Sequence, residues 1–472
     1  MKSSIRALAQ LILENIDILE ADCAQRHADE PSLQEPFKPG SGFATDRPEV
    51  RKASSIIAAA AQQLAQAVRA PEVNLMTTAY AHTFAAGIRV AVEFHIADIL
   101  QEAGPEGLHL KDIASTCNAD PVKLGQVLRL LVSTWIFKEV KPDVFANNRN
   151  SSVMVKGLPA AQLFSSPEIK YSQPESAMAA LLACIGDECL KGASCMYETL
   201  SDPSTAFSGE GKDAALCRAF GTKKPIWEFF DEPEQRDRVH RFGIGMKAAA
   251  TFQPMELTIQ GFDWGSLKKD SVVVDVGGGI GTLSVALAKK FPHLKLVVQD
   301  RGPVVEDGLE RTSIDFPEGL ESGRLSFQEH DFFKTNPIKN ADVFMAKYVM
   351  HDWSDQISVE ILKHLREAAT PNTKLILLDK IIPHMCPSSE LEESAIDISV
   401  PGSLKPDVPE PIIHMSGNGH MSSMVVMAFC NGQERTLSSF VKVCADAGWK
   451  VSEVFMHDAF GHYISQILAI PV

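Results

Sequence analysis

Residues 272–300 read VVVDVGGGIGTLSVALAKKFPHLKLVVQD, and this stretch decides the fold of the carboxyl-terminal part of the chain. A short β-branched run is followed by a glycine-rich turn, a segment with helical spacing of its apolar residues, and a second β-branched run. This order is typical of two parallel strands joined by a helix, with a ligand-binding turn at the carboxyl end of the first strand. The stretch therefore predicts one β-α-β unit of a nucleotide-binding sheet.

The same alternation continues beyond residue 300. Further strand-like runs read RLSFQEHD, DVFMAKY and KLILLDKII, and later strands are expected at 449–455 and 462–470, with a helix at 437–447. Strands that alternate with helices indicate a parallel, doubly wound sheet. We therefore expect an α/β, Rossmann-like catalytic domain over residues 261–472.

The glycine-rich turn and the end of the next strand predict a nucleoside pocket. Gly277 lets a ligand touch the backbone, and Asp300 ends the second strand, where a carboxylate can accept both ribose hydroxyls. A dinucleotide fingerprint needs GxGxxG, but the last place is Thr282 when counted from Gly277 and Ser284 when counted from Gly279. A dehydrogenase is therefore the weaker enzyme alternative.

A histidine follows the predicted strand DVFMAKY. Residues 349–355 read VMHDWSD, so His351 is expected at the carboxyl edge of the sheet, beside the ligand pocket. Phenols have an unperturbed pKa near 10, and an oriented neutral imidazole can take their proton around pH 7. A histidine in such a loop can also be purely structural, and the residues alone leave both interpretations open.

Five motifs carry a resemblance to a known family. They read DVGGGIGTLSVALAKKFPHLKLVVQD, HDFF, KYVMHDWSD, LLDKIIP and NGQERTLSSF, and they recur in this order between residues 270 and 440. In these motifs the chain resembles the plant-type small-molecule O-methyltransferases, which include the caffeate and flavonoid enzymes, and their fungal relatives. The resemblance implies an enzyme that uses S-adenosyl-methionine to methylate a hydroxyl of a small acceptor.

The resemblance also implies roles for individual residues. His351 would be the general base, and Asp379 and Glu434 the carboxylates that fix its tautomer and stabilise the imidazolium. The plant enzymes usually have Glu at the position of Asp379, so this carboxylate reaches one carbon less far here. The implied cofactor-binding residues are Gly277 at the methionine moiety, Asp300 at the ribose, Asp331 and Phe332 at the adenine, and Lys347 near the cofactor carboxylate or a backbone carbonyl.

The amino-terminal part of the chain is predicted to be helical and to contain a winged helix. We expect a helical extension over 1–70, a winged-helix-like domain over 71–165, and a helical linker over 166–260 that would wall the acceptor pocket. In the resembled family the winged helix is a dimerisation domain, which implies a homodimer. A DNA-binding regulator is the non-enzyme alternative, but the predicted recognition helix carries only Lys123 and Arg129 as basic residues.

Composition excludes several other classes of protein. Apolar residues make up 45% of the chain and charged residues 22%, and no apolar run approaches the length that spans a bilayer. The formal net charge of −15 disfavours nucleic acid as a partner. Nine cysteines without paired CxxC spacing indicate a reducing, cytoplasmic setting. The expected partner is thus a small molecule, with neither nucleic acid nor membrane involved.

The stretch 385–421 is expanded relative to the plant pattern, and together with the long amino-terminal extension it resembles the fungal members. It contains His414 and His420, but no carboxylate cluster accompanies them, so we expect no bound metal.

These features together predict transfer of a methyl group from S-adenosyl-methionine to a hydroxyl of a small aromatic secondary metabolite, phenolic or polyketide-like, with His351 as general base. The alternative is a cofactor-binding protein of the same fold that catalyses a non-methylating, pericyclic reaction, as some fungal relatives do. The presence of His351, Asp379 and Glu434 argues against this alternative.

Overall fold

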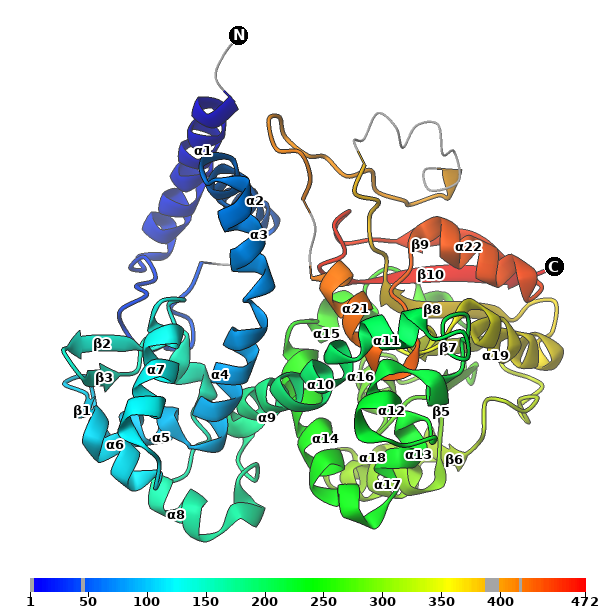
Figure 1. Cartoon of the computed structure of the whole chain (residues 1–472). Helices are drawn as coiled ribbons and strands as arrows, with labels where there is room; N and C mark the ends of the chain where they lie inside the picture. The colour runs from blue at the N-terminus through cyan, green and yellow to red at the C-terminus, as the bar shows by residue number, and fades with distance from the viewer. Residues whose placement is uncertain (1–3, 44–46, 387–398, 416–417) are drawn as a thin grey trace. The chain divides into compact units, whose positions relative to one another are not determined.

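The computed structural model describes residues 4–43, 47–386, 399–415 and 418–472. The chain forms two compact units (Figure 1). The first comprises Met1–Lys191, Trp227–Thr251 and Val408–Met415, and the second comprises Gly192–Ile226, Phe252–Asp407 and Ser416–Val472. The predicted linker over 166–260 is therefore divided between the two units.

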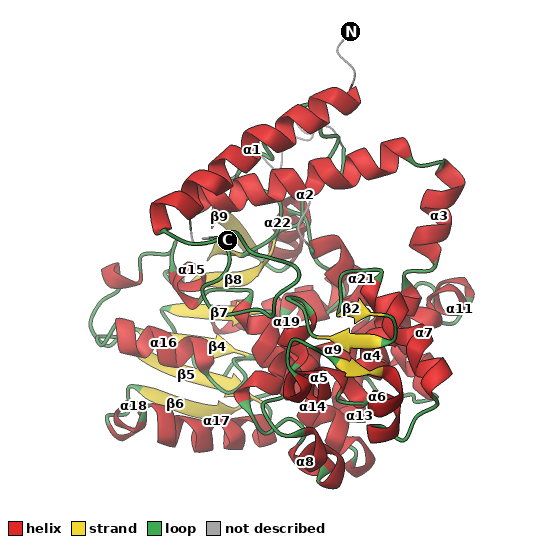
Figure 2. Cartoon of the chain, turned by 90° about the vertical axis from the view of Figure 1, so that its left-hand side faces the viewer, coloured by secondary structure: helices red, strands yellow, loops and turns green. Residues whose placement is uncertain are grey.

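A seven-stranded sheet forms the centre of the second unit (Figure 2). Its order is β6-β5-β4-β7-β8-β10-β9, and the strands β4 to β8 run parallel to one another. The last strand, β10, lies between β8 and β9 and is antiparallel to both. The strands are β4 (Val272–Val276), β5 (Lys295–Asp300), β6 (Leu325–Glu329), β7 (Val343–Lys347), β8 (Lys374–Lys380), β9 (Trp449–Phe455) and β10 (Ile464–Pro471). The α/β, Rossmann-like prediction is confirmed, with one antiparallel strand inserted near an edge.

Alternate residues of the central strands enter two separate cores, one on each face of the sheet. In β7, Phe344 packs in one core and Val343 in the other, because successive side chains of a strand point to opposite faces. Helices cover both faces, which explains why these strands are apolar throughout. The helices of this unit are α11 (Met196–Ser201), α12 (Ala215–Phe220), α15 (Met255–Ile259), α16 (Thr282–Lys290), α17 (Gly302–Asp315), α18 (Pro317–Glu321), α19 (Asp355–Ala368), α21 (Gly419–Cys430) and α22 (Leu437–Asp446).

The first unit contains the winged helix that the sequence predicts. Helices α6 (Leu110–Thr116) and α7 (Pro121–Val132) are joined by a short turn, and a three-stranded sheet of order β1-β3-β2 packs beside them. The turn ends at Asp120, whose carboxylate accepts a hydrogen bond from the backbone N–H of Lys123 and so caps α7. The strands are β1 (Leu108–His109), β2 (Lys138–Lys141) and β3 (Val144–Ala146).

The remaining helices of the first unit extend this domain on both sides in sequence. They are α1 (Ser4–Arg26), α2 (Pro48–Val68), α3 (Pro71–Ala79), α4 (His82–Glu93), α5 (Ile96–Ala103), α8 (Ala160–Ser165), α9 (Ala177–Cys184) and α14 (Arg236–Thr251). The chain passes between the units within α10 (Leu190–Ser194) and α13 (Ile226–Phe230). Within the described ranges, no helix is long and apolar enough to cross a membrane.

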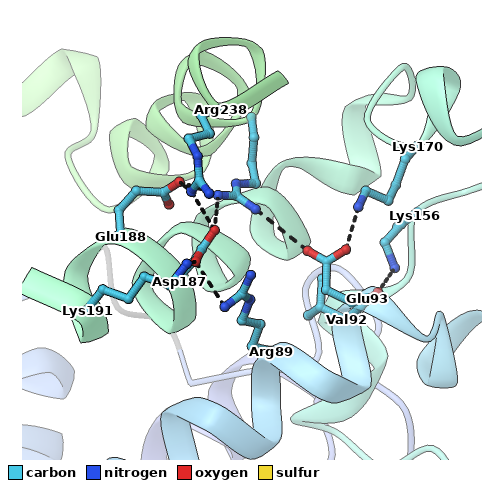
Figure 3. Close-up of polar contacts among 10 residues, drawn as sticks. Arg89, Val92, Glu93, Lys156, Lys170, Asp187, Glu188, Lys191 and Arg238 are labelled. Carbon is cyan, nitrogen blue, oxygen red and sulfur yellow. Dashed lines mark hydrogen bonds and ion pairs between the residues drawn. The ribbon is translucent and has the colours of Figure 1, made fainter. Parts of the chain in front are cut away.

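A buried ionic cluster joins three elements of the first unit (Figure 3). The chain makes a π-helical turn directly after α9, at Ile185–Cys189, and Asp187 and Glu188 of this turn are almost completely buried. Both carboxylates pair with Arg238 and Arg241 of α14, and Asp187 also pairs with Arg89 of α4 at 2.9 Å. Buried charges are tolerated when they are paired in this way. The cluster therefore links α4, the π turn and α14.

A second buried ion pair lies in the same unit. The ammonium of Lys156 is 3.1 Å from Asp98 Oδ2 and donates to the carbonyl oxygen of Val92 at 2.8 Å. The backbone N–H of Lys156 donates to the other oxygen of Asp98 at 2.6 Å. Both side chains are 1% exposed, so water cannot replace either partner.

Candidate active site

The glycine-rich turn follows β4 directly. Gly277, Gly279 and Gly281 have φ angles of 64°, 59° and 79°, which glycine adopts without steric cost. A Cβ atom on Gly277 would lie 2.8 Å from Cγ2 of Val349, whereas a Cβ atom on Gly279 would meet nothing within 4 Å. The turn is thus tightly packed at its start and open further along, so a ligand can approach the backbone there.

Asp300 ends the neighbouring strand β5 and is tied to this turn. Its Oδ2 accepts a hydrogen bond of 2.8 Å from the backbone N–H of Gly279. Its Oδ1 accepts one of 2.8 Å from the backbone N–H of Arg301. The structure therefore places the carboxylate beside the glycine-rich turn, which is where the sequence predicts the ribose.

A buried carboxyl group lies directly under the turn. Asp275 of β4 is 1% exposed, and a Cβ atom on Gly278 would lie 2.7 Å from its carboxyl carbon. One oxygen accepts a hydrogen bond from the hydroxyl of Ser284, while Oδ1 has no partner among the described residues. Burial raises the pKa of Asp275 to about 6. An unsatisfied acceptor at a glycine-lined cradle fits a ligand with hydrogen-bond donors, such as the amino-acid part of S-adenosyl-methionine.

Lys347 ends β7 on the adjacent strand. Burial lowers the pKa of its ammonium, and the charges of Asp275 and Asp379 oppose this shift. The ammonium also lies 4.8 Å from the ring centroid of Tyr348. Lys347 therefore lies at the same sheet edge as the glycine-rich turn, near the carboxyl groups of Asp275 and Asp379.

The two residues predicted to contact adenine follow β6. Phe332 lies close to the turn, since a Cβ atom on Gly277 would be 3.8 Å from its ring. Asp331 is half exposed, accepts a hydrogen bond from the backbone N–H of Phe333, and pairs with Lys334 at 3.3 Å. The structure thus places Phe332 beside the glycine-rich turn, and one carboxylate oxygen of Asp331 is already engaged by Lys334.

His351 and Glu434 come together at the carboxyl edge of the sheet. After β7, Tyr348 adopts a positive φ of 53°, and His351 lies in the 3₁₀ turn Met350–Asp352. Its Nδ1 is 3.3 Å from Oε1 of Glu434, and the same oxygen accepts a hydrogen bond of 2.9 Å from Ser422. The carboxylate is 2% exposed, so His351 has a fixed partner on Nδ1.

Backbone pairing brings these distant segments to one place. The N–H of Gln433 donates to the carbonyl oxygen of His351 at 2.8 Å, and the N–H of Ile382 donates to the carbonyl oxygen of Arg435 at 3.0 Å. A Cβ atom on Gly432 would overlap the backbone at His351, so this position requires glycine. The loop that carries Glu434 is therefore held against both the His351 turn and the end of β8.

Asp379 lies near His351 without a hydrogen bond to it. It is fully buried in β8, and neither carboxylate oxygen has a hydrogen-bond partner among the described residues. Burial raises its pKa to about 7, the charge of His351 opposes this shift, and the charge of Glu434 adds to it. The structure thus brings Glu434 to the imidazole, while the shorter Asp379 acts on it only through its charge.

Two further residues, which the sequence does not single out, support His351. The fully buried guanidinium of Arg435 donates to the carbonyl oxygens of Met350 and Trp353, at 2.6 and 2.7 Å, on either side of His351. The ring of Tyr348 stacks on the imidazole with centroids 5.0 Å apart. Arg435 lies within the motif NGQERT and Tyr348 within KYVMHDW, but nothing in their spacing predicts these contacts.

The surrounding carboxylates change the acid-base behaviour of His351. Burial lowers the pKa of the imidazole, but the charge of Asp352, the hydrogen bond with Glu434 and the charge of Asp379 outweigh it and raise the pKa to about 9. The sequence predicts an unperturbed imidazole, which is neutral near pH 7. A pKa of about 9 instead favours the protonated imidazole at that pH.

No metal centre is found in the described part of the chain, where no three His, Cys, Asp or Glu side chains are arranged to hold an ion. The stretch 385–421, which contains His414 and His420, lies partly outside the described residues, at 387–398 and 416–417.

Comparisons with known proteins agree with this geometry. Residues 197–401 match the model of the O-methyltransferase domain, and residues 76–157 match that of the O-methyltransferase dimerisation domain. The chain is 36% identical over 480 residues to an O-methyltransferase of Armillaria gallica and 34% identical over 484 residues to 4-O-methyltransferase 1 of Phanerochaete chrysosporium. Both alignments cover 100% of each chain.

Solved structures show the same fold. OxaC in complex with sinefungin and meleagrin matches with a TM-score of 0.65 and 16% identity, covering 98% of this chain and 99% of its own. The mitomycin 7-O-methyltransferase MmcR matches with a TM-score of 0.62 and 24% identity, covering 85% and 98%. The resemblance found in the sequence motifs is thus confirmed, and the chain belongs to the O-methyltransferase family as an S-adenosyl-methionine-dependent O-methyltransferase.

Proposed function

We propose that the enzyme methylates a phenolic hydroxyl of a small aromatic secondary metabolite and that His351 is the general base. The observation that carries this proposal is the 3.3 Å contact between His351 Nδ1 and the buried carboxylate of Glu434. A carboxylate on Nδ1 holds the proton there and leaves Nε2 as the basic nitrogen. The acceptor class is supported by relatives such as sterigmatocystin 8-O-methyltransferase of Aspergillus flavus, which is 29% identical over 316 residues.

Different residues of the chain serve cofactor binding and proton transfer. The turn at Gly277, with Asp300, Phe332 and Lys347, would hold S-adenosyl-methionine, which supplies a methyl group on a positively charged sulfur when bound. Nε2 of His351 takes the hydroxyl proton as the acceptor oxygen attacks that methyl group. Glu434, through its contact with Nδ1, stabilises the imidazolium that forms.

A pericyclic enzyme of the same fold remains the alternative function. A structure described as a pericyclic reaction enzyme matches with a TM-score of 0.64 and 14% identity, a likeness that concerns the fold alone. The two functions differ in one product: only methyl transfer consumes the cofactor and moves its methyl carbon to the acceptor.

Incubation with methyl-labelled S-adenosyl-methionine and a panel of phenols tests the proposal directly. We expect label in the extracted phenol and one equivalent of S-adenosyl-homocysteine per methylated product. A matched panel in which each hydroxyl is already methylated is the control. Turnover of an aromatic substrate without transfer of label, at saturating cofactor, would instead support the pericyclic alternative.

The cofactor pocket is tested by Asp300→Ala. Loss of charge-assisted hydrogen bonds to the ribose, each worth roughly 1.5–3 kcal/mol, should weaken cofactor binding about tenfold or more, and loss of the bond to Gly279 should loosen the turn. Isothermal titration calorimetry measures the affinity, and Asp307→Ala, on the exposed face of α17, is the control. An unchanged affinity in folded Asp300→Ala would remove Asp300 from the site.

The dimerisation domain leads us to propose a homodimer in which helix α3 takes part. None of its residues is buried. Val73 and Met76 of α3 and Tyr80, which follows the helix directly, share one face and are 49%, 54% and 57% exposed. An apolar face of this kind indicates an interaction surface, and the matched dimerisation model begins at residue 76.

Met76→Glu should therefore dissociate the dimer. An unpaired carboxylate in an apolar interface costs roughly 3 kcal/mol, which raises the dissociation constant by on the order of 10²-fold. Multi-angle light scattering at micromolar concentration should show a dimer for the wild type and a monomer for the variant. Thr78→Glu adds the same charge on the opposite face of α3 and should remain dimeric; equal behaviour of the two variants would refute a role for this face.

A further inference from the structure

The imidazole of His351 has a different carboxylate at each ring nitrogen. Nδ1 is 3.3 Å from Oε1 of Glu434, and Nε2 is 3.5 Å from Oδ1 of Asp352. Glu434 is fixed by Ser422 and by its burial. Asp352 is thus the carboxylate beside Nε2, the nitrogen to which the proposed function assigns the acceptor proton.

Asp352 is itself held in place. The thiol of Cys430 donates to its Oδ1 across 3.9 Å, and its backbone N–H donates to the carbonyl oxygen of Val349 at 3.1 Å. Burial raises the pKa of Asp352, and the positive charge of His351 opposes this shift. The carboxylate and the imidazolium therefore stabilise each other's charged form.

We propose that Asp352 is a positioning residue for methyl transfer, which keeps Nε2 of His351 protonated in the resting enzyme and sets the basicity of this nitrogen for a phenolic acceptor. The inference rests on the proposed role of His351 as base. It adds that the base is active only in the small fraction of enzyme that has lost the Nε2 proton, and that this fraction rises with pH.

The proton balance follows from these contacts. The acceptor O–H bond breaks and its proton goes to Nε2, while the new O–CH₃ bond forms and the S–CH₃ bond breaks with its electron pair staying on sulfur. The positive charge thus moves from sulfur to the imidazolium, which Asp352 and Glu434 flank. The proton on Nε2 then leaves to solvent and the base is restored.

The physical advantage of this arrangement is that the basicity of the imidazole comes closer to that of the phenolate. Transfer from a phenol, with a pKa near 10, to an unperturbed imidazole near 6.5 is uphill. A second carboxylate beside Nε2 makes the nitrogen a stronger base and brings the pKa of the imidazole closer to that of the phenol. The fraction of enzyme with an unprotonated Nε2 near pH 7 becomes smaller as a result. The charged and titratable groups around His351 that enter this balance are Asp352, Tyr348, Asp379, Lys380, Cys430, Glu434 and Arg435.

The test measures the protonation of His351 without an acceptor. Protein with ¹³C-labelled histidine is titrated by NMR, and the His351 signal is assigned by its absence in His351→Gln. We expect a wild-type midpoint near pH 9. Asp352→Asn should lower it by about one to three pH units, the usual effect of removing an opposite charge at this distance, and the acid limb of kcat/KM should move with it. Asp352→Glu should restore much of the shift, and Glu360→Gln, an exposed carboxylate on α19, should leave it unchanged.

The outcomes separate this inference from the proposed function. Cofactor affinity by calorimetry shows that each variant is folded, and Asp352→Ala takes the place of Asp352→Asn if the latter does not fold. The role of Asp352 is overturned if His351 of the wild type titrates with a midpoint near pH 6.5, or if His351 titrates alike in Asp352→Asn and in the wild type. This conclusion holds even if His351 is the base. Full activity of His351→Gln overturns the base itself, whatever the titration shows.

Discussion

Replacement of His351 by Gln is expected to lower turnover by a factor on the order of 10²–10⁴, the usual contribution of a positioned acid or base, while cofactor affinity stays unchanged. Gln is similar in size and can still hydrogen-bond to Glu434, so the pocket keeps its shape. It cannot take a proton. The expected loss is therefore in kcat, because the base acts in the transition state and adds little to binding.

The carboxylates around the base should not contribute equally. Glu434→Gln removes the charge 3.3 Å from Nδ1 and should slow turnover strongly. Asp379→Asn should have a smaller effect, because neither oxygen of Asp379 makes a hydrogen bond among the described residues. Both effects should be far from additive with His351→Gln, since no imidazolium remains to be stabilised.

The measurement is turnover of a confirmed phenolic acceptor over a range of pH. The pKa of His351 is about 9, and below this pH the imidazole is protonated and cannot act as a base. The wild-type kcat/KM should therefore rise with pH up to about 9. The variant should lose this limb. Near-native turnover of His351→Gln, with the same limb, would show that another group takes the proton.

Replacement of Lys156 by Met should destabilise the first unit by about 3–5 kcal/mol, because it leaves the carboxylate of Asp98 buried without a counter-charge. Met has nearly the same length, so the change creates little cavity. Thermal unfolding of the full chain should show a clearly lower midpoint for the transition of this unit.

The pH dependence of the stability lost in Lys156→Met identifies the cause of the loss. Burial already raises the pKa of Asp98, and the charge of Lys156 opposes the shift. Without the ammonium the folded-state pKa rises further above that of the unfolded chain, so unfolding becomes more favourable as pH increases through this range. The loss should therefore be smaller at pH 5 than at pH 8.

The matched control is the double variant Asp98→Asn with Lys156→Met. Asn still accepts the hydrogen bond that the backbone N–H of Lys156 gives to Asp98 Oδ1, but it carries no charge. Most of the stability should return, since neutral replacement of a buried ion pair costs little. If Lys156→Met alone is as stable as the wild type, the ion pair between Asp98 and Lys156 does not contribute significantly to stability.

Local sequence was sufficient to predict the elements of the catalytic unit. The run VVVDV is a strand and the segment beginning at Thr282 is a helix, as expected, because a short β-branched run and a helical pattern of apolar residues depend only on neighbours along the chain. The place of Asp300 beside the glycine-rich turn also followed, since parallel strands end at one edge of a sheet. The antiparallel insertion of β10 could not be predicted, because the pairing of strands depends on contacts between residues far apart in the sequence.

The environment of His351 shows what the motifs do not determine. The motifs of the family led to His351, Asp379 and Glu434, but motifs do not report distances. Only the folded chain decides that Glu434 reaches the imidazole and Asp379 does not, that Arg435 holds the turn, and that Asp352 lies 3.5 Å from Nε2. These are contacts between residues up to 85 positions apart. A pKa depends on burial and on every nearby charge. The sequence alone therefore determined that His351 is the candidate base, whereas the basicity of its imidazole is decided only by the tertiary structure, which brings these charges around it.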